Sequence, residues 1–275
     1  MTNSLTNTVP PTKYLGRSGQ GNIAYDIQGT GPLVLLVPGM GDLRSAYRFI
    51  TPALLAAGYT VATTDLRGHG DSDSSFDAYG DVATAGDIEA LITELGRPAI
   101  IVGNSMSAGS AVIVAAEHPE LVAGLVLVGP FVRQPSTTAF ENLAFRVMMA
   151  RPWAAAAWKA YMPRLYAGTK PVDFAEYQQR VIASIKRPGY ASAFSLTTRT
   201  DHLLAAASLV GVDAPTLVIM GDKDPDFKNP KAEADWIAGS LDGTAVMVPD
   251  AGHYPQSQQP TLVSAAIIDF LQRRK

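Results

Sequence analysis

The sequence contains no cysteine, which excludes disulfide bonds, cysteine zinc sites, iron–sulfur clusters and a thiol nucleophile. Charge is also scarce: 17% of the 275 residues are charged, with 22 Lys and Arg against 25 Asp and Glu. The resulting net charge of −3 argues against a nucleic-acid partner, because such proteins carry a basic stripe. Apolar runs such as Leu33–Val37 fall far short of the roughly 20 residues that span a bilayer. We therefore expect no membrane partner.

The composition is otherwise that of a folded protein. Hydrophobic residues make up 47% of the chain, too many for a disordered one. A length of 275 residues suits a single large α/β domain. The N-terminal stretch has neither a basic start nor an apolar run, so it does not resemble a signal peptide. We predict that residues 1–13 form a disordered lead-in and that the protein is cytoplasmic.

Short β-branched and apolar runs alternate with helical patterns along most of the chain. The apolar residues of 82–95 recur at spacings of three and four, and Gly96 provides a stop signal. A second such stripe runs from Leu262 to Leu271. This alternation predicts an α/β fold, a mostly parallel twisted sheet with helices on both faces. The predicted strands cover residues 33–37, 60–64, 99–102, 125–128, 216–220 and 245–248.

One segment interrupts the alternation of strands and helices. Residues 131–212 contain no convincing strand and carry Trp153, Trp158 and several proline breaks. We interpret this segment as a helical insertion between two strands and call residues 131–212 the cap. The predicted core of the fold is then formed by residues 14–130 and 213–275.

The strongest chemical signal is the sequence Gly103-Asn-Ser-Met-Ser-Ala-Gly109, in which a buried strand leads into Ser105 and small residues begin a helix. A serine on such a sharp turn projects its hydroxyl above the sheet. The next N–H, that of Met106, lies at a helix N-terminus, where developing negative charge is favoured. The alternative is a small-residue helix packed on a sheet, with an incidental serine.

Two further signals follow predicted strands. Asp222 and Asp224 come after the run at 216–220, and His253 follows the last strand. The other histidines fit a catalytic position less well: His69 lies in a glycine-rich loop, His118 in a helix-end turn and His202 in the cap. Serine, acid and histidine thus each follow a strand, at the edge where open α/β sheets build their sites.

These motifs resemble the α/β-hydrolase superfamily, with serine esterases and C–C bond hydrolases as near groups. The resemblance covers residues 14–275 and includes Val37–Gly41 and the segment Asp65–Ser72. It implies a triad of Ser105, Asp224 and His253, with Asp224 rather than Asp222 as the acid. It also implies that the N–H groups of Met40 and Met106 bind the oxyanion.

Two positions depart from the pattern of that family. Pro38-Gly39 stands where the family often has His-Gly, and Ser107 stands where it usually has glycine. The Arg67-Gly-His-Gly70 sequence could suggest phosphate binding, but we interpret it as a tight structural turn near the site.

The expected activity is hydrolysis of an ester or related acyl bond in a small to medium hydrophobic substrate. The expected reaction proceeds through an acyl-enzyme and needs neither a metal nor another cofactor. Three alternatives remain: C–C bond hydrolysis of a diketone or dienoate, cofactor-free perhydrolysis, and ligand sensing by a hydrolase-like fold. An aspartate-nucleophile enzyme is disfavoured because position 105 is serine. We expect a monomer or homodimer whose pocket is lined by apolar residues in and near the cap: Phe131, Phe145, Met148, Met149, Trp153, Trp158 and Tyr161.

Overall fold

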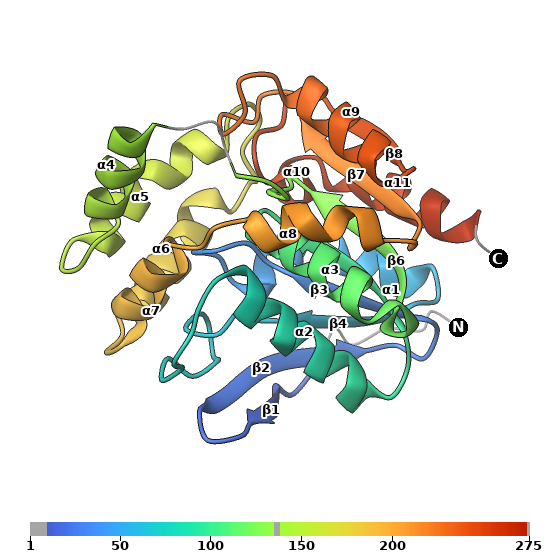
Figure 1. The fold of residues 1–275 in the computed structure, drawn as a ribbon, viewed down its shortest axis with the longest axis horizontal. Helices are drawn as coiled ribbons and strands as arrows, with labels where there is room; N and C mark the ends of the chain where they lie inside the picture. The colour runs from blue at the N-terminus through green and yellow to red at the C-terminus, as the bar shows by residue number, and fades with distance from the viewer. Residues whose placement is uncertain (1–9, 135–137, 274–275) are drawn as a thin grey trace, which may run out of the picture.

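The computed structural model describes residues 10–134 and 138–273, and its centre is an eight-stranded sheet (Figure 1). The strand order is β1-β2-β4-β3-β5-β6-β7-β8. Strands β1, β2 and β4 pair antiparallel, and all other neighbours pair parallel. The strands are β1 (Lys13–Arg17), β2 (Gly21–Gln28), β3 (Leu33–Val37), β4 (Thr60–Thr64), β5 (Ala99–Asn104), β6 (Val122–Val128), β7 (Thr216–Gly221) and β8 (Thr244–Val248).

The inner strands are buried on both faces, as their continuous apolar sequences require. In β3, Leu33, Leu35 and Val37 belong to one hydrophobic cluster, while Val34 and Leu36 belong to another. Each cluster therefore fills one side of the sheet, and helices close both sides. The prediction of a mostly parallel sheet between helical layers is confirmed.

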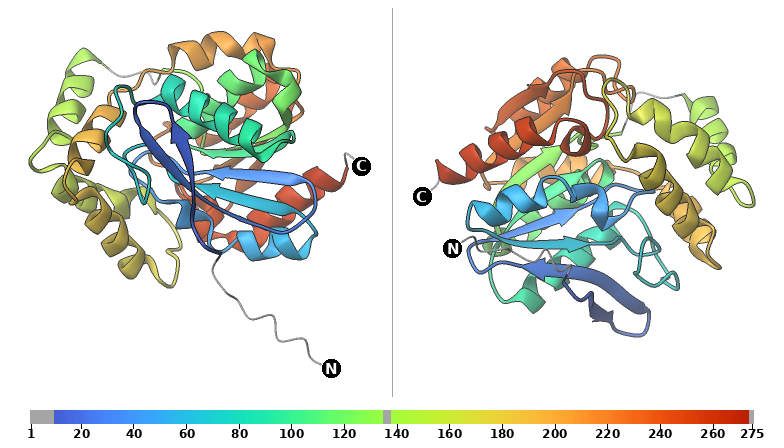
Figure 2. Two further views of the ribbon diagram at one scale, coloured as in Figure 1. Left: turned by 90° about the horizontal axis from the view of Figure 1, so that it is seen from below. Right: turned by 180° about the vertical axis from the view of Figure 1, so that it is seen from behind.

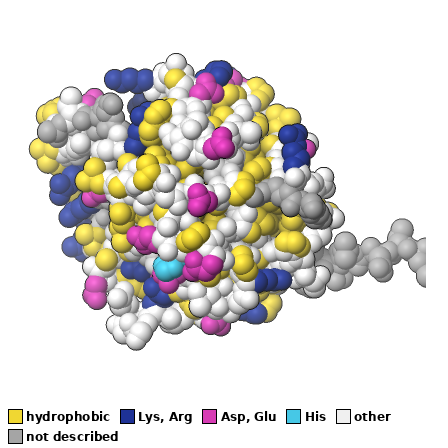
Figure 3. All heavy atoms as spheres, turned by 45° about the vertical axis from the view of Figure 1, so that its right-hand side comes forward, with side chains coloured by type: hydrophobic (Ala, Val, Ile, Leu, Met, Phe, Trp, Pro, Cys, Tyr) yellow, Lys and Arg dark blue, Asp and Glu magenta, His cyan; other side chains and the backbone are white. Residues whose placement is uncertain are grey.

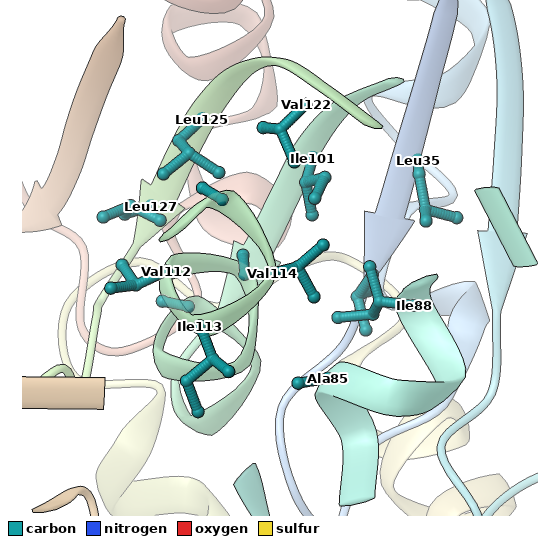
Figure 4. Close-up of a cluster of buried hydrophobic side chains, with 14 of the residues drawn as sticks. Leu35, Ala85, Ile88, Ile101, Val112, Ile113, Val114, Val122, Leu125 and Leu127 are labelled. Carbon is teal, nitrogen blue, oxygen red and sulfur yellow. The ribbon is translucent and has the colours of Figure 1, made fainter. Parts of the chain in front are cut away.

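Helices cover the two faces in separate groups. In Figure 4, Ala85 and Ile88 of α2 and Val112 and Ile113 of α3 pack against strand residues such as Ile101. Helices α1 and α11 cover the opposite face (Figure 2). The helices are α1 (Thr51–Ala56), α2 (Asp81–Leu95), α3 (Met106–Glu117), α4 (Ala139–Met148), α5 (Ala154–Leu165), α6 (Phe174–Ile185), α7 (Tyr190–Thr197), α8 (Leu203–Ser208), α9 (Pro230–Ser240), α10 (Pro255–Gln258) and α11 (Pro260–Gln272), with short 3-10 turns at Arg44–Tyr47, Pro119–Leu121 and Leu209–Gly211.

The six predicted strands are all present, but the antiparallel β1–β2 hairpin was not predicted. Its strands are half-exposed and contain glycine and polar residues, so they lack a long apolar run. Strand β1 begins at Lys13, inside the predicted lead-in, and residues 1–9 of that lead-in lie outside the described residues.

The cap joins β6 to β7, as the insertion pattern predicts. Helices α4 to α7 extend to one side of the sheet, whereas α8 packs against α3 (Figures 1 and 2). The loops that follow β3, β5, β7 and β8 all lie at the carboxyl edge of the parallel strands, next to the cap. Within the described residues, we find no helix with both the length and the apolar character needed to cross a bilayer.

Candidate active site

Ser105 sits on a strained turn between β5 and α3. Its backbone has φ 58° and ψ −124°, a left-handed conformation that a non-glycine residue rarely adopts. Its N–H donates to the carbonyl of Val128 at 2.9 Å, which anchors the turn to β6. Gly103 makes the turn possible, since a Cβ there would lie 2.5 Å from the carbonyl oxygen of Ser107. The strand-turn-helix geometry expected of a serine nucleophile is therefore present.

His253 and Asp224 form a buried pair on the loops that follow β8 and β7. The distance from His253 Nδ1 to Asp224 Oδ2 is 2.8 Å, and both residues are 2% exposed. A second carboxylate, Asp226, places Oδ2 3.7 Å from the same nitrogen. The potential ligand atoms of these three residues lie within 4.8 Å of one another, a spacing that a divalent cation could also use. The hydrogen bond at Nδ1 is the one by which an acid orients a catalytic imidazole.

The charges around His253 favour its protonated form. Burial alone lowers its pKa, but the charge and hydrogen bond of Asp224, followed by the charges of Asp226 and Asp42, raise the pKa to about 9. An imidazolium formed when His253 accepts a proton is therefore stabilised at this site.

Backbone and side-chain bonds bring the serine turn close to the histidine loop. The Asn104 amide donates to the carbonyls of Val128 at 2.9 Å and His253 at 3.3 Å. The Phe131 N–H donates to the carbonyl of Ser105 at 3.2 Å, and the Phe131 ring lies 5.8 Å from the imidazole of His253. No hydrogen bond joins the Ser105 hydroxyl to His253 among the described residues, and such bonds often form only when substrate binds.

The loop after β3 runs beside Ser105, where an oxyanion donor is needed. A Cβ on Gly39 would lie 2.9 Å from the Cβ of Ser105. The Ser107 hydroxyl donates to the carbonyl of Pro38 at 2.6 Å, so the two positions that depart from the family pattern contact each other. Met106 is the first residue of α3, and its N–H has no acceptor within the helix. We refer to Pro38–Gly41 as the oxyanion loop.

His69 holds the far end of the oxyanion loop. Its Nε2 accepts from the N–H of Gly41 at 2.9 Å, and its Nδ1 lies 3.0 Å from the carbonyl of Arg67, which can only accept. This arrangement requires a neutral ring with the proton on Nδ1, and burial lowers the pKa of His69 to about 4. The glycine-rich turn around His69 thus has a structural role. No motif in the sequence indicated that Gly41 would be its partner.

Comparison with known proteins shows the family of this chain. The model of the alpha/beta hydrolase family matches residues 34–266. The chain belongs to the alpha/beta hydrolase family. It is 30% identical over 260 residues to "Putative non-heme bromoperoxidase BpoC" from Mycobacterium tuberculosis, covering 90% of this chain and 97% of the relative. It is 27% identical over 260 residues to the 2-(acetamidomethylene)succinate hydrolase of Mesorhizobium japonicum, covering 91% and 92%. Among solved structures, a thermophilic esterase from Thermogutta terrifontis superposes with a TM-score of 0.77 at 24% identity, covering 96% and 99%.

The cap of this alpha/beta hydrolase reaches both sides of the site. On α5, the Trp158 indole donates to the carbonyl of Gly41 at 2.8 Å, and the Tyr161 hydroxyl donates to Asp226 at 2.8 Å. On α6, the Tyr177 hydroxyl bonds to Asp42, whose pKa burial raises to about 6. Ser105 is consequently only 4% exposed.

The predicted pocket residues of the hydrolase divide into two groups. Phe131, Trp158 and Tyr161 contact the catalytic loops, and Phe145 packs edge-on against Tyr161. For the remaining three, the structure gives the burial of the side chain, and their place in the pocket stays a prediction. Met149 is fully buried in the core, whereas Met148 is 38% exposed and Trp153 is 50% exposed.

The hydrolase has a groove of about 890 Å³ that is separate from the Ser105 site. Its lining includes Arg44, which is paired with Asp26 at 2.7 Å and with Asp71 at 2.8 Å. Ser105 and His253 do not line it. The charge of Arg44 is thus already balanced, and we assign the groove no part in catalysis.

Proposed function

We propose that this alpha/beta hydrolase cleaves ester or related acyl bonds with Ser105 as nucleophile, His253 as general base and Asp224 as the orienting acid. The observation that carries the proposal is the 2.8 Å contact between His253 Nδ1 and Asp224, at the sheet edge where Ser105 occupies its strained turn. A serine hydroxyl is weakly nucleophilic until a neighbouring base removes its proton.

In the first half of the reaction, His253 Nε2 takes the Ser105 proton as Oγ attacks the carbonyl carbon. The oxyanion that forms accepts hydrogen bonds from the N–H groups of Met40 and Met106, each donor being worth about 3 kcal/mol. The imidazolium then gives its proton to the leaving alcohol. In the second half, His253 activates water, which attacks the acyl-enzyme and releases the acid and the free serine.

The surroundings of the site favour a hydrophobic acyl group. The Phe131 ring packs 5.0 Å from Phe227 and 5.8 Å from His253, so apolar surface lies directly beside the imidazole. The acidic groups Asp224 and Asp226 disfavour a substrate with several negative charges. We therefore expect short to medium esters to be better substrates than polyanionic thioesters.

The test is labelling with a fluorophosphonate together with turnover of p-nitrophenyl butyrate. Wild-type protein should be labelled on the peptide that contains Ser105, and Ser105→Ala should fold normally but lose nearly all labelling and turnover. Ser110→Ala is the matched control, because Ser110 is a buried serine one turn further along α3. Turnover that survives in Ser105→Ala would exclude the mechanism.

A second candidate, perhydrolysis, is favoured by the relative named as a non-heme bromoperoxidase, with which the chain is 30% identical. Here hydrogen peroxide replaces water in the attack on the acyl-enzyme and releases a peracid, which then oxidises bromide. The discriminating measurement is bromination of monochlorodimedone in acetate buffer with peroxide. Bromination that exceeds ester hydrolysis and disappears in Ser105→Ala would favour this second function.

A further inference from the structure

The outermost helix of the cap carries an exposed apolar stripe. In α4, Phe140, Leu143 and Val147 are 78%, 58% and 54% exposed. Spacings of three and four residues place them on one face of the helix. The views in Figures 1 and 2 agree that α4 lies at the periphery of the molecule, away from the sheet.

This stripe points away from the protein rather than into it. Phe145 is the residue of α4 that packs inward, edge-on to Tyr161 of α5 with ring centroids 6.4 Å apart. At 3.6 residues per turn, Phe145 lies roughly 170° around the helix from the centre of the stripe. A surface helix normally turns its apolar side to the core. An apolar stripe with the opposite orientation indicates a surface that binds something outside the chain.

The charge of the segment that contains α4 and α5 indicates what covers the stripe. Residues 138–170 contain five basic side chains and one acidic one, Glu141, which is engaged in a capping box with Thr138. All five basic residues are exposed: Arg146, Arg151, Lys159, Arg164 and Lys170. Figure 3 shows hydrophobic side chains at its left edge with Lys and Arg side chains below them. The occupant must therefore be both apolar and negatively charged.

A two-fold contact with a second copy of the chain satisfies these conditions poorly. The cap has 10 Lys and Arg against four Asp and Glu, a net charge of +6, while the rest of the chain has 12 against 21, a net charge of −9. A two-fold contact through α4 would bring two basic caps together. An anionic bilayer instead offers an apolar interior beneath negative headgroups, and the exposed indole of Trp153 suits that boundary.

We propose that α4 binds the surface of an anionic phospholipid bilayer, with Phe140, Leu143 and Val147 inserted at the interface and the basic side chains at the headgroups. This differs from the expectation of no membrane partner, which rested on the lack of a segment long enough to span a bilayer. A helix of ten residues lies on such a surface without crossing it.

Sedimentation with vesicles tests the proposal independently of catalysis. Wild-type protein should bind vesicles of phosphatidylcholine mixed with phosphatidylglycerol, should bind phosphatidylcholine alone much more weakly, and should be released by added salt. The triple variant Phe140→Ser, Leu143→Ser, Val147→Ser should partition at least about tenfold more weakly. It should retain its fold and its turnover of a soluble ester, because the three side chains are exposed and far from Ser105.

The matched control replaces three exposed apolar residues elsewhere in the cap. Val172, Val210 and Leu203 are 100%, 96% and 66% exposed, so Val172→Ser, Val210→Ser, Leu203→Ser changes a similar apolar surface. The proposal is overturned if wild-type protein binds neither type of vesicle, or if the two triple variants bind alike. It is also overturned if sedimentation velocity shows a wild-type dimer that only the α4 variant dissociates, since a second copy would then cover the stripe.

Discussion

Removing the hydroxyl of Ser107 should loosen the oxyanion loop and leave Ser105, His253 and Asp224 in place. Ser107 is fully buried and donates to the carbonyl of Pro38 at 2.6 Å. Ser107→Ala leaves this carbonyl without its side-chain donor, at a cost of about 1–3 kcal/mol in the free energy of unfolding. Pro38 immediately precedes Gly39, which lies against Ser105, so the loosened segment is the one that positions the Met40 N–H.

The size of the catalytic effect has an upper bound. Loss of an oxyanion donor lowers kcat by about 10²–10³. Ser107 acts only through the loop, so we expect Ser107→Ala to lower kcat of p-nitrophenyl butyrate hydrolysis by about tenfold to a hundredfold. KM should change little, because the donor matters mainly in the transition state.

Ser110→Ala is the matched control for this measurement. Ser110 is also fully buried on α3, but its hydroxyl has no hydrogen-bond partner among the described residues. Its removal should leave kcat unchanged and should leave the free energy of unfolding unchanged or slightly higher. Equal losses of kcat in the two variants, or a Ser107→Ala variant that loses stability but keeps full kcat, would refute the reasoning.

Two pH dependences follow from the buried groups. The catalytic imidazole must be neutral to act as a base, so kcat/KM should rise with pH along an acid limb near pH 9. Asp226→Asn removes a negative charge beside His253 and should move that limb down by about one to three pH units. The control Asp235→Asn, at an exposed position, should not move it, and pH–rate profiles of the two variants will show the difference. The pKa of His69 is lowered to about 4 in the folded protein, against about 6.5 in the unfolded chain. His69 therefore contributes about 3 kcal/mol to the free energy of unfolding above pH 6.5, and this contribution is lost as the pH falls through 4. The raised pKa of Asp42 changes stability with pH in the opposite direction, so the effect of His69 must be isolated by comparing wild type with His69→Gln. Urea unfolding of both proteins across this pH range gives the free energy of unfolding against pH. Equal slopes for the two proteins would contradict the role given to His69.

Much of the fold could be predicted because its inner strands are apolar on both faces. A continuously apolar run such as Leu33–Val37 can be buried on both faces only between two helical layers. The positions of such strands could therefore be predicted from the sequence. The β1–β2 hairpin could not be predicted in the same way, since each strand buries only part of its length. Its pairing with β4 depends on a partner that is distant in the sequence.

The site was predictable to the extent that backbone geometry constrains its residue types. Gly103 and Ser105 stand out because a strained turn accepts few side chains. Asn104 and Asp226 gave no such signal, because amides and carboxylates are common after strands and their bonds to the histidine loop exist only in the folded chain. Trp153 shows that residue type alone does not determine burial, since this large apolar residue in the cap is half exposed.

Access to Ser105 and the basicity of His253 both depend on α5. Trp158 bonds to the oxyanion loop and Tyr161 bonds to Asp226, so α5 touches both sides of the site. Ser105 is 4% exposed, so a shift of α5 would open the site to an acyl substrate and would weaken both bonds. Without the Tyr161 donor, the charge of the ionised Asp226 carboxylate is less neutralised, and it supports the imidazolium of His253 more strongly. We therefore expect the movement that admits substrate also to favour the protonated form of His253; a Tyr161→Phe variant with an acid limb no higher than that of wild type would contradict this coupling.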